Sequence, residues 1–462
     1  MPLDVSQVSI DNLFGSLVYS IGALSVILIV LALGFIDSGN VRKRNVLDTW
    51  VVKVIGAMIA GLGTILVGYS FWQWSFYQAF GVPNALGQAI SDWWIGGQFQ
   101  STPSINIGSE VLPGADAQQV FVVFFATFSM ATLALIHGGV LERVRPRVLY
   151  VMAAVIGLAL SPLASYLTWG PVGPLTQLGI HDFEGIYPLY IFSAVWVLVM
   201  SWRLGPRLGA FAPHSTKIRP KKHNSSLIGI GVLLIMFALP FVALSATWII
   251  PGTGVYGISF AETGWGIIIM NVVTAFVGGG LSGALLAHWK KEAGFGFVGP
   301  IAGVVMSGTL LDIGTPLEVL ILSVFGPFVA YLVSLALVRL GIDDQKVIPL
   351  GLGPGVVGAI ATGFIAWGTK TGGYPGLEGA YALHSAEVTP LGQAAGVGAV
   401  ALLAAIPCLI ICLIFERFGG LRVPEQVEIA GLDAAHWKTE NFADELLETE
   451  KSASADSPSG RP

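Results

Sequence analysis

The chain has 462 residues, of which 54% are hydrophobic and only 11% are charged, and its formal net charge is −5. A soluble globular protein carries about 25% charged residues, so this composition excludes that class and indicates a polytopic membrane protein. The slight acidic balance and the lack of a basic patch exclude a nucleic-acid partner. The two cysteines, Cys408 and Cys412, lie in one apolar run, which predicts neither a disulfide nor a metal site.

Eleven apolar runs are long enough to cross the roughly 30 Å hydrocarbon core of a bilayer, which takes about 20 residues of helix. In chain order they cover approximately residues 14–37, 47–72, 118–141, 148–169, 187–205, 226–249, 262–288, 296–312, 317–340, 348–368 and 393–416. No basic segment precedes the first run, so we expect no cleavable signal peptide. An odd number of spans predicts that the two ends of the chain lie on opposite sides of the membrane.

Basic residues are concentrated in every second connection between these spans. The basic residues of these connections are Arg42, Lys43, Arg44, Arg143, Arg145, Arg147, Arg203, Arg207, Lys217, Arg219, Lys221, Lys222, Lys290, Lys291, Arg339, Lys346, Arg417 and Arg422. The intervening loops contain only Lys370. The positive-inside rule therefore predicts a multi-pass protein of the cell (inner) membrane, with its N-terminus outside and its C-terminus in the cytoplasm.

Eleven spans that start outside are compatible with two five-helix halves of opposite topology followed by one extra helix. Asp182 precedes the fifth span, and Asp343 and Asp344 precede the tenth span in the equivalent position, which supports such an inverted repeat. We expect an all-α transmembrane domain of eleven helices over residues 1–420. A cytoplasmic tail should follow over residues 421–462, and its polar last part should be disordered.

A few residues within or beside the spans are candidates for a solute site. Asp182 can cap helix-end N–H groups or help to attract cations, and both roles stay open. Phe124 and Phe128 are four residues apart, so they share one helix face, although such a stripe in an apolar helix usually packs. Trp169 ends the fourth span, where an aromatic residue of the membrane interface is the ordinary explanation. These residues alone indicate a channel or transporter whose substrate they do not specify.

Several segments, taken in order, resemble the ammonium transporter / Rh family between about Gly34 and Trp437. The first cytoplasmic loop, GNVRKRNVL, is similar to the family's Gly-x-x-Arg-x-Lys-Asn-x-Leu turn. FFATFSMATLALIHGGVLER resembles the third-helix pattern, and HDFEG resembles the Asp-Phe-Ala-Gly-Gly segment that opens the fifth helix. The most specific segment is GLRVPEQVEIAGLDAAHW, which is close to the family's tail signature.

The resemblance implies a homotrimer of eleven-helix protomers, each with an inverted five-helix repeat and its own pore, and no enzymatic activity or cofactor. Trp169 and Ser245 match the outer recruitment site, where an indole face and a hydroxyl hold an ammonium cation. Phe124 matches a further aromatic residue of the outer vestibule. Asp182 matches the carboxylate that supports this site.

The same resemblance assigns the gate and the centre of the pore. Phe128 and Phe241 match the stacked phenyl gate. The family places one His eight residues after the Asp of the fifth helix and a second His on the tenth helix. Tyr190 occupies the first position here, and Gly351 or Leu352 occupies the second, depending on where a one-residue gap is placed.

The loss of both imidazoles changes the expected chemistry, since an imidazole titrates near neutral pH and can relay a proton. A tyrosine hydroxyl, with a pKa near 10, can hydrogen-bond ammonia but is a poor relay. Glu184 replaces a small residue of the pattern two positions after Asp182. An altered relay through Tyr190 and Glu184, passage of a neutral molecule, a different amine, and a blocked pore used for sensing all remain open.

We therefore expect a membrane transporter or channel for ammonium, ammonia or a closely related small amine. A non-conducting ammonium sensor or regulator, and a channel switched to another small solute, are the alternatives. The tail also resembles the surface on which family members meet PII-type nitrogen-signalling proteins. Trp437 stands there where the family usually has Gly, and a PII-type regulatory protein is a candidate partner.

Overall fold

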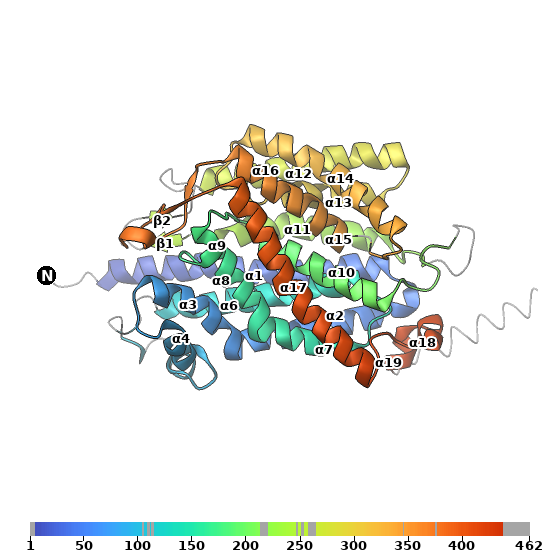
Figure 1. The fold of residues 1–462 in the computed structure, drawn as a ribbon, viewed down its shortest axis with the longest axis horizontal. Helices are drawn as coiled ribbons and strands as arrows, with labels where there is room; N and C mark the ends of the chain where they lie inside the picture. Colours follow the sequence, from blue (N-terminus) through green and yellow to red (C-terminus); the bar gives the residue numbers. More distant parts are fainter. Residues whose placement is uncertain are drawn as a thin grey trace, which may run out of the picture.

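The computed structural model describes residues 5–103, 106–108, 111, 115–212, 220–245, 248–250, 254–256, 265–344, 346–374 and 377–437. Over these residues the chain forms a helical bundle whose long helices run roughly along one axis (Figure 1). Ten helical segments are long and apolar enough to cross a membrane, and a shorter apolar helix, α13, completes the set. The prediction of an all-α membrane protein with eleven helices is confirmed.

The first five spans form one half of the bundle, and three of them contain a π-helical turn. In chain order they are α1 (Val5–Asn40); α2 (Val46–Gly63) with η2 (Thr64–Gly68) and α3 (Tyr69–Ala79); α6 (Ala115–Gly139); α7 (Pro146–Val155) with η4 (Ile156–Leu160) and α8 (Ser161–Trp169); and η5 (Ile186–Ile191) with α10 (Phe192–Leu204). The second span is longer than its apolar run predicts, because α3 continues it with a more polar sequence.

The next five spans repeat this order, and a final helix follows them. They are α11 (Ser225–Ser245); α12 (Trp265–Lys290); α13 (Gly294–Ser307); α14 (Pro316–Arg339); and α15 (Val347–Leu350) with η6 (Gly351–Gly355) and α16 (Val356–Ile365). The last helix, α17 (Pro390–Phe418), crosses the bundle obliquely (Figure 1). α1 packs along α11, and η5 packs against η6, so equivalent elements of the two halves meet.

Short elements connect the spans at both ends of the bundle. They are η1 (Lys43–Asn45), α4 (Ala85–Trp93), α5 (Gln98–Ser101), α9 (Pro174–Gln177), β1 (Trp248–Ile250), β2 (Gly254–Tyr256), β3 (Lys370–Thr371), η7 (Gly379–Tyr381), β4 (Ala386–Glu387), α18 (Glu425–Ala430) and α19 (Leu432–His436). β1 pairs with β2, and β3 pairs with β4, in two antiparallel ribbons. β1, β2, α4 and α9 lie at one end of the bundle, and α18 and α19 lie at the other (Figure 1).

Each half uses the same device where its last helix begins. The carboxylate of Asp182 accepts hydrogen bonds from the backbone N–H groups of Ile186 and Tyr187. The carboxylate of Asp344 accepts them from the N–H groups of Lys346 and Ile348. The side chain caps the unpaired N–H groups of a helix start in both cases, and a π-helical turn follows. This repetition agrees with the inverted repeat that the sequence predicts.

Glycines let two spans of the second half approach closely. A Cβ atom at Gly279 of α12 would lie 2.4 Å from the carbonyl oxygen of Gly299 in α13, and one at Gly303 would lie 2.5 Å from that of Ala275. Small residues at helix crossings of this kind are typical of membrane proteins, since close backbone contact replaces the hydrophobic driving force that lipid removes.

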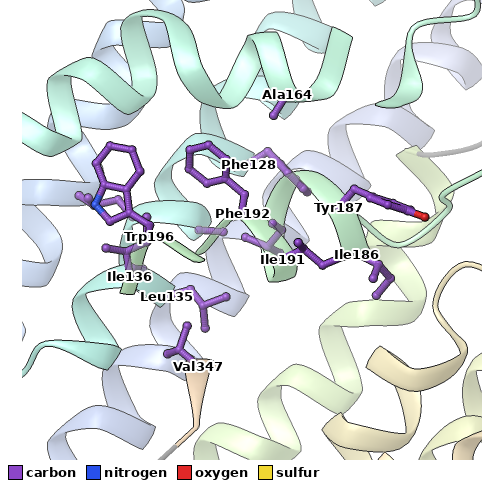
Figure 2. Close-up of a cluster of buried hydrophobic side chains, with 14 of the residues drawn as sticks. Phe128, Leu135, Ile136, Ala164, Ile186, Tyr187, Ile191, Phe192, Trp196 and Val347 are labelled. Atoms are coloured by element: carbon purple, nitrogen blue, oxygen red, sulfur yellow. The ribbon is translucent and has the colours of Figure 1, made fainter. Parts of the chain in front are cut away.

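The interior of the bundle is filled by large apolar side chains. Figure 2 shows Phe128 and Phe192 in the middle of one such cluster, with Tyr187 at one end and Trp196 at the other. Tyr187, Phe192 and Trp196 are fully buried. Large apolar side chains also cover the exterior; strongly exposed examples are Leu233, Leu281, Leu285, Leu332 and Leu402. An apolar exterior this extensive requires a bilayer around it.

The basic connections meet at one end of the bundle and are tied together by buried ion pairs. Glu142 pairs with Arg42 at 3.0 Å and with Arg207 at 3.1 Å. Asp343 pairs with Arg143 and Arg207, both at 2.7 Å. These loops, far apart in sequence, therefore form a single electrostatic cluster.

The first part of the tail folds onto this basic end. Glu428 of α18 is fully buried and accepts a hydrogen bond from the backbone N–H of Leu208. Asp433 of α19 accepts hydrogen bonds from the N–H groups of Leu47 and Asp48. The chain after residue 420 is thus packed as far as Trp437, and the expected disorder falls on residues 438–462, outside the described part.

Candidate functional site

Three aromatic side chains from two helices form a cluster at the end of the bundle opposite to the basic loops. The ring of Trp169, the last residue of α8, lies 4.8 Å from that of Phe128 and 6.5 Å from that of Phe124, centroid to centroid. Phe124 and Phe128 lie one helical turn apart on α6, and their rings are 6.0 Å apart. Both Phe side chains are buried, whereas Trp169 is partly exposed. The structure therefore brings these three candidates together.

The capped start of η5 lies directly against this aromatic cluster. Gly185 has a φ of +77°, and a Cβ atom there would lie 2.8 Å from Phe128 Cζ and 3.3 Å from Trp169 Cζ2. Only glycine can adopt this positive φ and also leave room for the two rings without strain. Asp182, buried three residues earlier, fixes this turn through its bonds to Ile186 (2.9 Å) and Tyr187 (3.1 Å). Burial raises the pKa of Asp182 to about 6, although these N–H donors oppose the rise.

The remaining outer candidates are not part of this cluster as described. The ring of Phe241 in α11 lies 5.4 Å from that of Phe237, and its side chain is 37% exposed. In the described structure the rings in contact with Phe128 are those of Phe124 and Trp169, so the expected stacking of Phe128 with Phe241 is not observed. Ser245 ends α11, but its side chain lies outside the described part of the structure.

The two π-helical turns at the centre each expose one side chain. Tyr190 is the only residue of η5 that retains appreciable accessible surface, and Leu352 is the only such residue of η6. Each lies eight residues after its capping carboxylate, Asp182 or Asp344. Gly351 is buried, and a Cβ atom there would lie 2.3 Å from the carbonyl oxygen of Tyr190. Gly351 thus permits the close approach of the two turns, and the neighbouring Leu352 is the residue of η6 whose side chain stays accessible.

Sequence reasoning missed a buried ion pair next to Asp182. His181 Nε2 lies 2.9 Å from Asp312 Oδ1, and both residues are buried. Burial alone would lower the pKa of His181, but the adjacent carboxylate of Asp312 raises it above its ordinary value. Gln393 of α17 holds the backbone of His181 through two hydrogen bonds. Asp312 ends the predicted eighth span, so a charge at that position was the available signal.

Glu184 completes this group, and one of its carboxylate oxygens has no hydrogen-bond partner within the described part of the chain. Its side chain is 8% exposed, and its Oε1 atom is buried without a hydrogen-bond partner among the described residues. Burial, together with repulsion from Asp182 and Asp312, raises the pKa of Glu184 to about 8. The sequence identified Glu184 as a departure from the family pattern, but it did not predict that His181 and Asp312 lie beside it.

Comparison with known proteins identifies the family. The model of the Ammonium Transporter Family matches residues 17–442. The ammonium transporter Amt1 of Methanocaldococcus jannaschii is 28% identical over 326 residues, which cover 69% of this chain and 76% of that protein. The ammonium transporter MEP1 of Saccharomyces cerevisiae is 28% identical over 432 residues, which cover 89% of this chain and 80% of the relative.

Solved structures agree with this assignment at the level of the fold. A structure described as a Sensor Amt Protein superposes with a TM-score of 0.73 at 19% identity, covering 93% of this chain and 99% of that one. Candida albicans Mep2 superposes with a TM-score of 0.66 at 19% identity, covering 89% of this chain and 86% of its own. With a family model that spans nearly all of its membrane helices, this chain belongs to the ammonium transporter family.

Proposed function

We propose that the protein conducts ammonium, ammonia or a closely related small amine across the membrane. The observation that carries this proposal is the cluster of Trp169, Phe124 and Phe128 packed on the capped start of η5. A cation over an indole face gains about 0.5–2 kcal/mol, depending on how far it is desolvated. Capture of that strength is weak enough for rapid release, which suits transport. Ser245 supplies the hydroxyl of this recruitment site in our proposal.

Phe128 is the gate that separates this site from the pore in our proposal. Its ring is buried against Trp169, so a solute held by the indole must displace it to move inward. Phe241 is the second gate residue by resemblance, and it would have to rotate toward Phe128 to take part. Tyr190 and Leu352 line the centre of the path in place of the two imidazoles, which leaves one hydroxyl and one apolar side chain there.

The remaining features of the proposal concern assembly and orientation. We propose a homotrimer in the cell (inner) membrane, with the aromatic cluster outside and the basic end in the cytoplasm. The grouping of the basic loops at one end supports this orientation. A PII-type regulatory protein would meet α18 and α19 at that end.

Uptake into proteoliposomes tests the proposed function. We expect uptake of ammonium and methylammonium by the wild type and a strong reduction in Trp169→Leu, because leucine keeps an apolar volume but offers no aromatic face. Trp367→Leu is the matched control, since Trp367 is an exposed tryptophan outside the aromatic cluster. Equal uptake by all three proteins would overturn the role of the aromatic cluster, and no uptake by any of them would overturn transport.

A non-conducting sensor of ammonium is the second candidate, and the missing imidazoles favour it. The fold shared with the Sensor Amt Protein is compatible with it. Binding of ammonium that Trp169→Leu abolishes, with no flux in the wild type, would support the sensor. Flux of an uncharged solute that does not vary with pH would instead support a channel switched to another substrate.

A further inference from the structure

The cluster of His181, Glu184 and Asp312 lies beside the aromatic cluster, since Gly185, the residue after Glu184, packs against Phe128 and Trp169. His181 reaches Asp312 at 2.9 Å, and a Cβ atom at Gly308 would lie 2.4 Å from Ile186 Cδ1. The segment from Gly308 to Asp312 therefore runs beside the segment from His181 to Ile186. Glu184 lies in this second segment, beside Gly185 whose Cα faces the rings of Phe128 and Trp169, and it is close enough to Asp312 for the two carboxylates to repel each other.

This cluster holds more negative charge than its own residues neutralise. The ion pair between His181 and Asp312 is the one ion pair that its carboxylates form within the described residues. Asp182 is stabilised by backbone N–H groups, but Oε1 of Glu184 and Oδ2 of Asp312 are both buried without a hydrogen-bond partner there. An ionised buried carboxylate without a counter-charge is strongly unfavourable, so the Glu184 side chain favours its protonated form unless a cation binds beside it.

We propose that Glu184 and Oδ2 of Asp312 form a binding site for one small cation that carries N–H donors, and that this cation exchanges with a proton on Glu184. The site deepens the proposed function, on which it rests, by adding a second cation position beside the aromatic cluster of Trp169, Phe124 and Phe128. An ammonium-type cation offers N–H groups to two carboxylate oxygens at once, which a potassium ion does not. When the cation enters, the O–H bond of Glu184 breaks and its proton leaves to water.

The titratable groups that face Glu184 fit this exchange. Asp182 and Asp312 repel its negative charge, and the hydroxyl of Tyr190 is close enough to interact with it electrostatically. His181 bonds Asp312 through Oδ1, which leaves Oδ2 of that carboxylate without a hydrogen-bond partner among the described residues. With the pKa of Glu184 raised to about 8, the empty site is mostly protonated at neutral pH. The cation must therefore displace a proton there.

Calorimetry on the full-length protein tests this proposal, with methylammonium chloride as the probe and potassium chloride as the comparison salt. Titrations in two buffers of different ionisation enthalpy count the protons released on binding. We expect release of about one proton per methylammonium near pH 7 and much less near pH 9, where Glu184 is already ionised. Glu184→Gln should release no proton and bind on the order of tenfold or more weakly, because a charge-assisted hydrogen bond is lost.

Two further variants separate the possible outcomes. Glu184→Asp keeps a carboxylate and should retain proton release, while Glu387→Gln changes an exposed glutamate and should behave as the wild type. Unchanged affinity and proton release in Glu184→Gln would overturn the inner site. Trp169→Leu should weaken capture without abolishing proton release, so failure of the outer site and failure of the inner site give different results.

Discussion

The two ends of this bundle treat buried carboxylates in opposite ways. At the basic end Glu142 and Asp343 are each held by arginine side chains, and these arginines hold the pKa of both groups below its usual range although burial opposes this. At the end that carries Trp169, Glu184 has no arginine partner among the described residues, and its pKa is raised to about 8. The same chemical group is therefore held in an ion pair at one end, and at the other it is the group for which we propose proton exchange. Pairing with arginine side chains is what distinguishes Glu142 and Asp343 from Glu184 in the described structure.

Removal of one buried arginine should strongly destabilise the basic end of the bundle. Arg143 is buried and donates hydrogen bonds to Asp343, Ser201 and the carbonyl of Gly139. Arg143→Ala leaves carboxylate charge buried without this partner, so we expect a loss of about 3–5 kcal/mol of stability, measured by thermal unfolding in detergent. Arg339→Ala, which removes an exposed arginine, should change stability by less than about 0.5 kcal/mol. Equal effects of the two changes would contradict the proposed difference between paired and unpaired ends.

Removal of the Glu184 carboxylate should raise the stability of the protein near pH 8, whereas removal of Arg143 should lower it. The pKa of Glu184 is raised above its unfolded value of about 4.5, so the folded state binds the proton more tightly. Stability from this group is present at low pH and is lost as pH rises through about 5 to 8, by roughly 1 kcal/mol per pH unit. Glu184→Gln should therefore flatten the pH dependence of the melting temperature and melt higher than the wild type near pH 8. A steeper pH dependence of the melting temperature in Glu184→Gln than in the wild type would contradict this interpretation.

The smallest effect is expected from the exposed phenylalanine of the outer end. Phe241 is 37% exposed and has one observed ring contact, so Phe241→Ala should cost about 1 kcal/mol or less in stability. Phe128→Ala is the matched comparison and should cost about 3–5 kcal/mol, because its ring is buried. Measured in the same proteoliposomes, uptake should respond more to Phe128→Ala. Equal responses would indicate that Phe241 moves into contact with Phe128 during transport.

The long apolar runs predicted most of the fold. Each predicted span overlaps an observed helix, because lipid requires continuous helices of apolar residues and so leaves a strong pattern in the sequence. The extension of the second span to Ala79, and the short helices α4 and α5, were not predicted, since their sequences mix polar and apolar residues. The packing of α18 and α19 was not predicted for a related reason. A polar segment such as this can fold when its carboxylates accept hydrogen bonds from backbone N–H groups and from partly exposed arginines.

The site was predictable in part. The sequence pointed to Trp169, Phe124 and Phe128, since their order along the chain matched the family, and the structure brings these rings together. The pair of His181 and Asp312 was not predictable from spacing, because the two residues lie 131 positions apart on connecting segments without a regular period. The sequence left open whether Gly351 or Leu352 takes the second central position. The structure shows that Gly351 lies at the close contact of the two π-helical turns, whereas Leu352 keeps accessible surface.

The carboxyl caps of η5 and η6 have a consequence for what can cross the centre of the bundle. A helix start carries about half a positive charge, and Asp182 and Asp344 each offset the one beside them. Between these capped starts the side chains of η5 and η6 that keep accessible surface are Tyr190 and Leu352, and of the two only Tyr190 has a polar group that could replace water around an ion. An ion would lose its hydration energy there without compensation, whereas a neutral amine would lose far less. We therefore expect the charge of the solute to be given up before the centre, at the outer end where Glu184 can receive a proton.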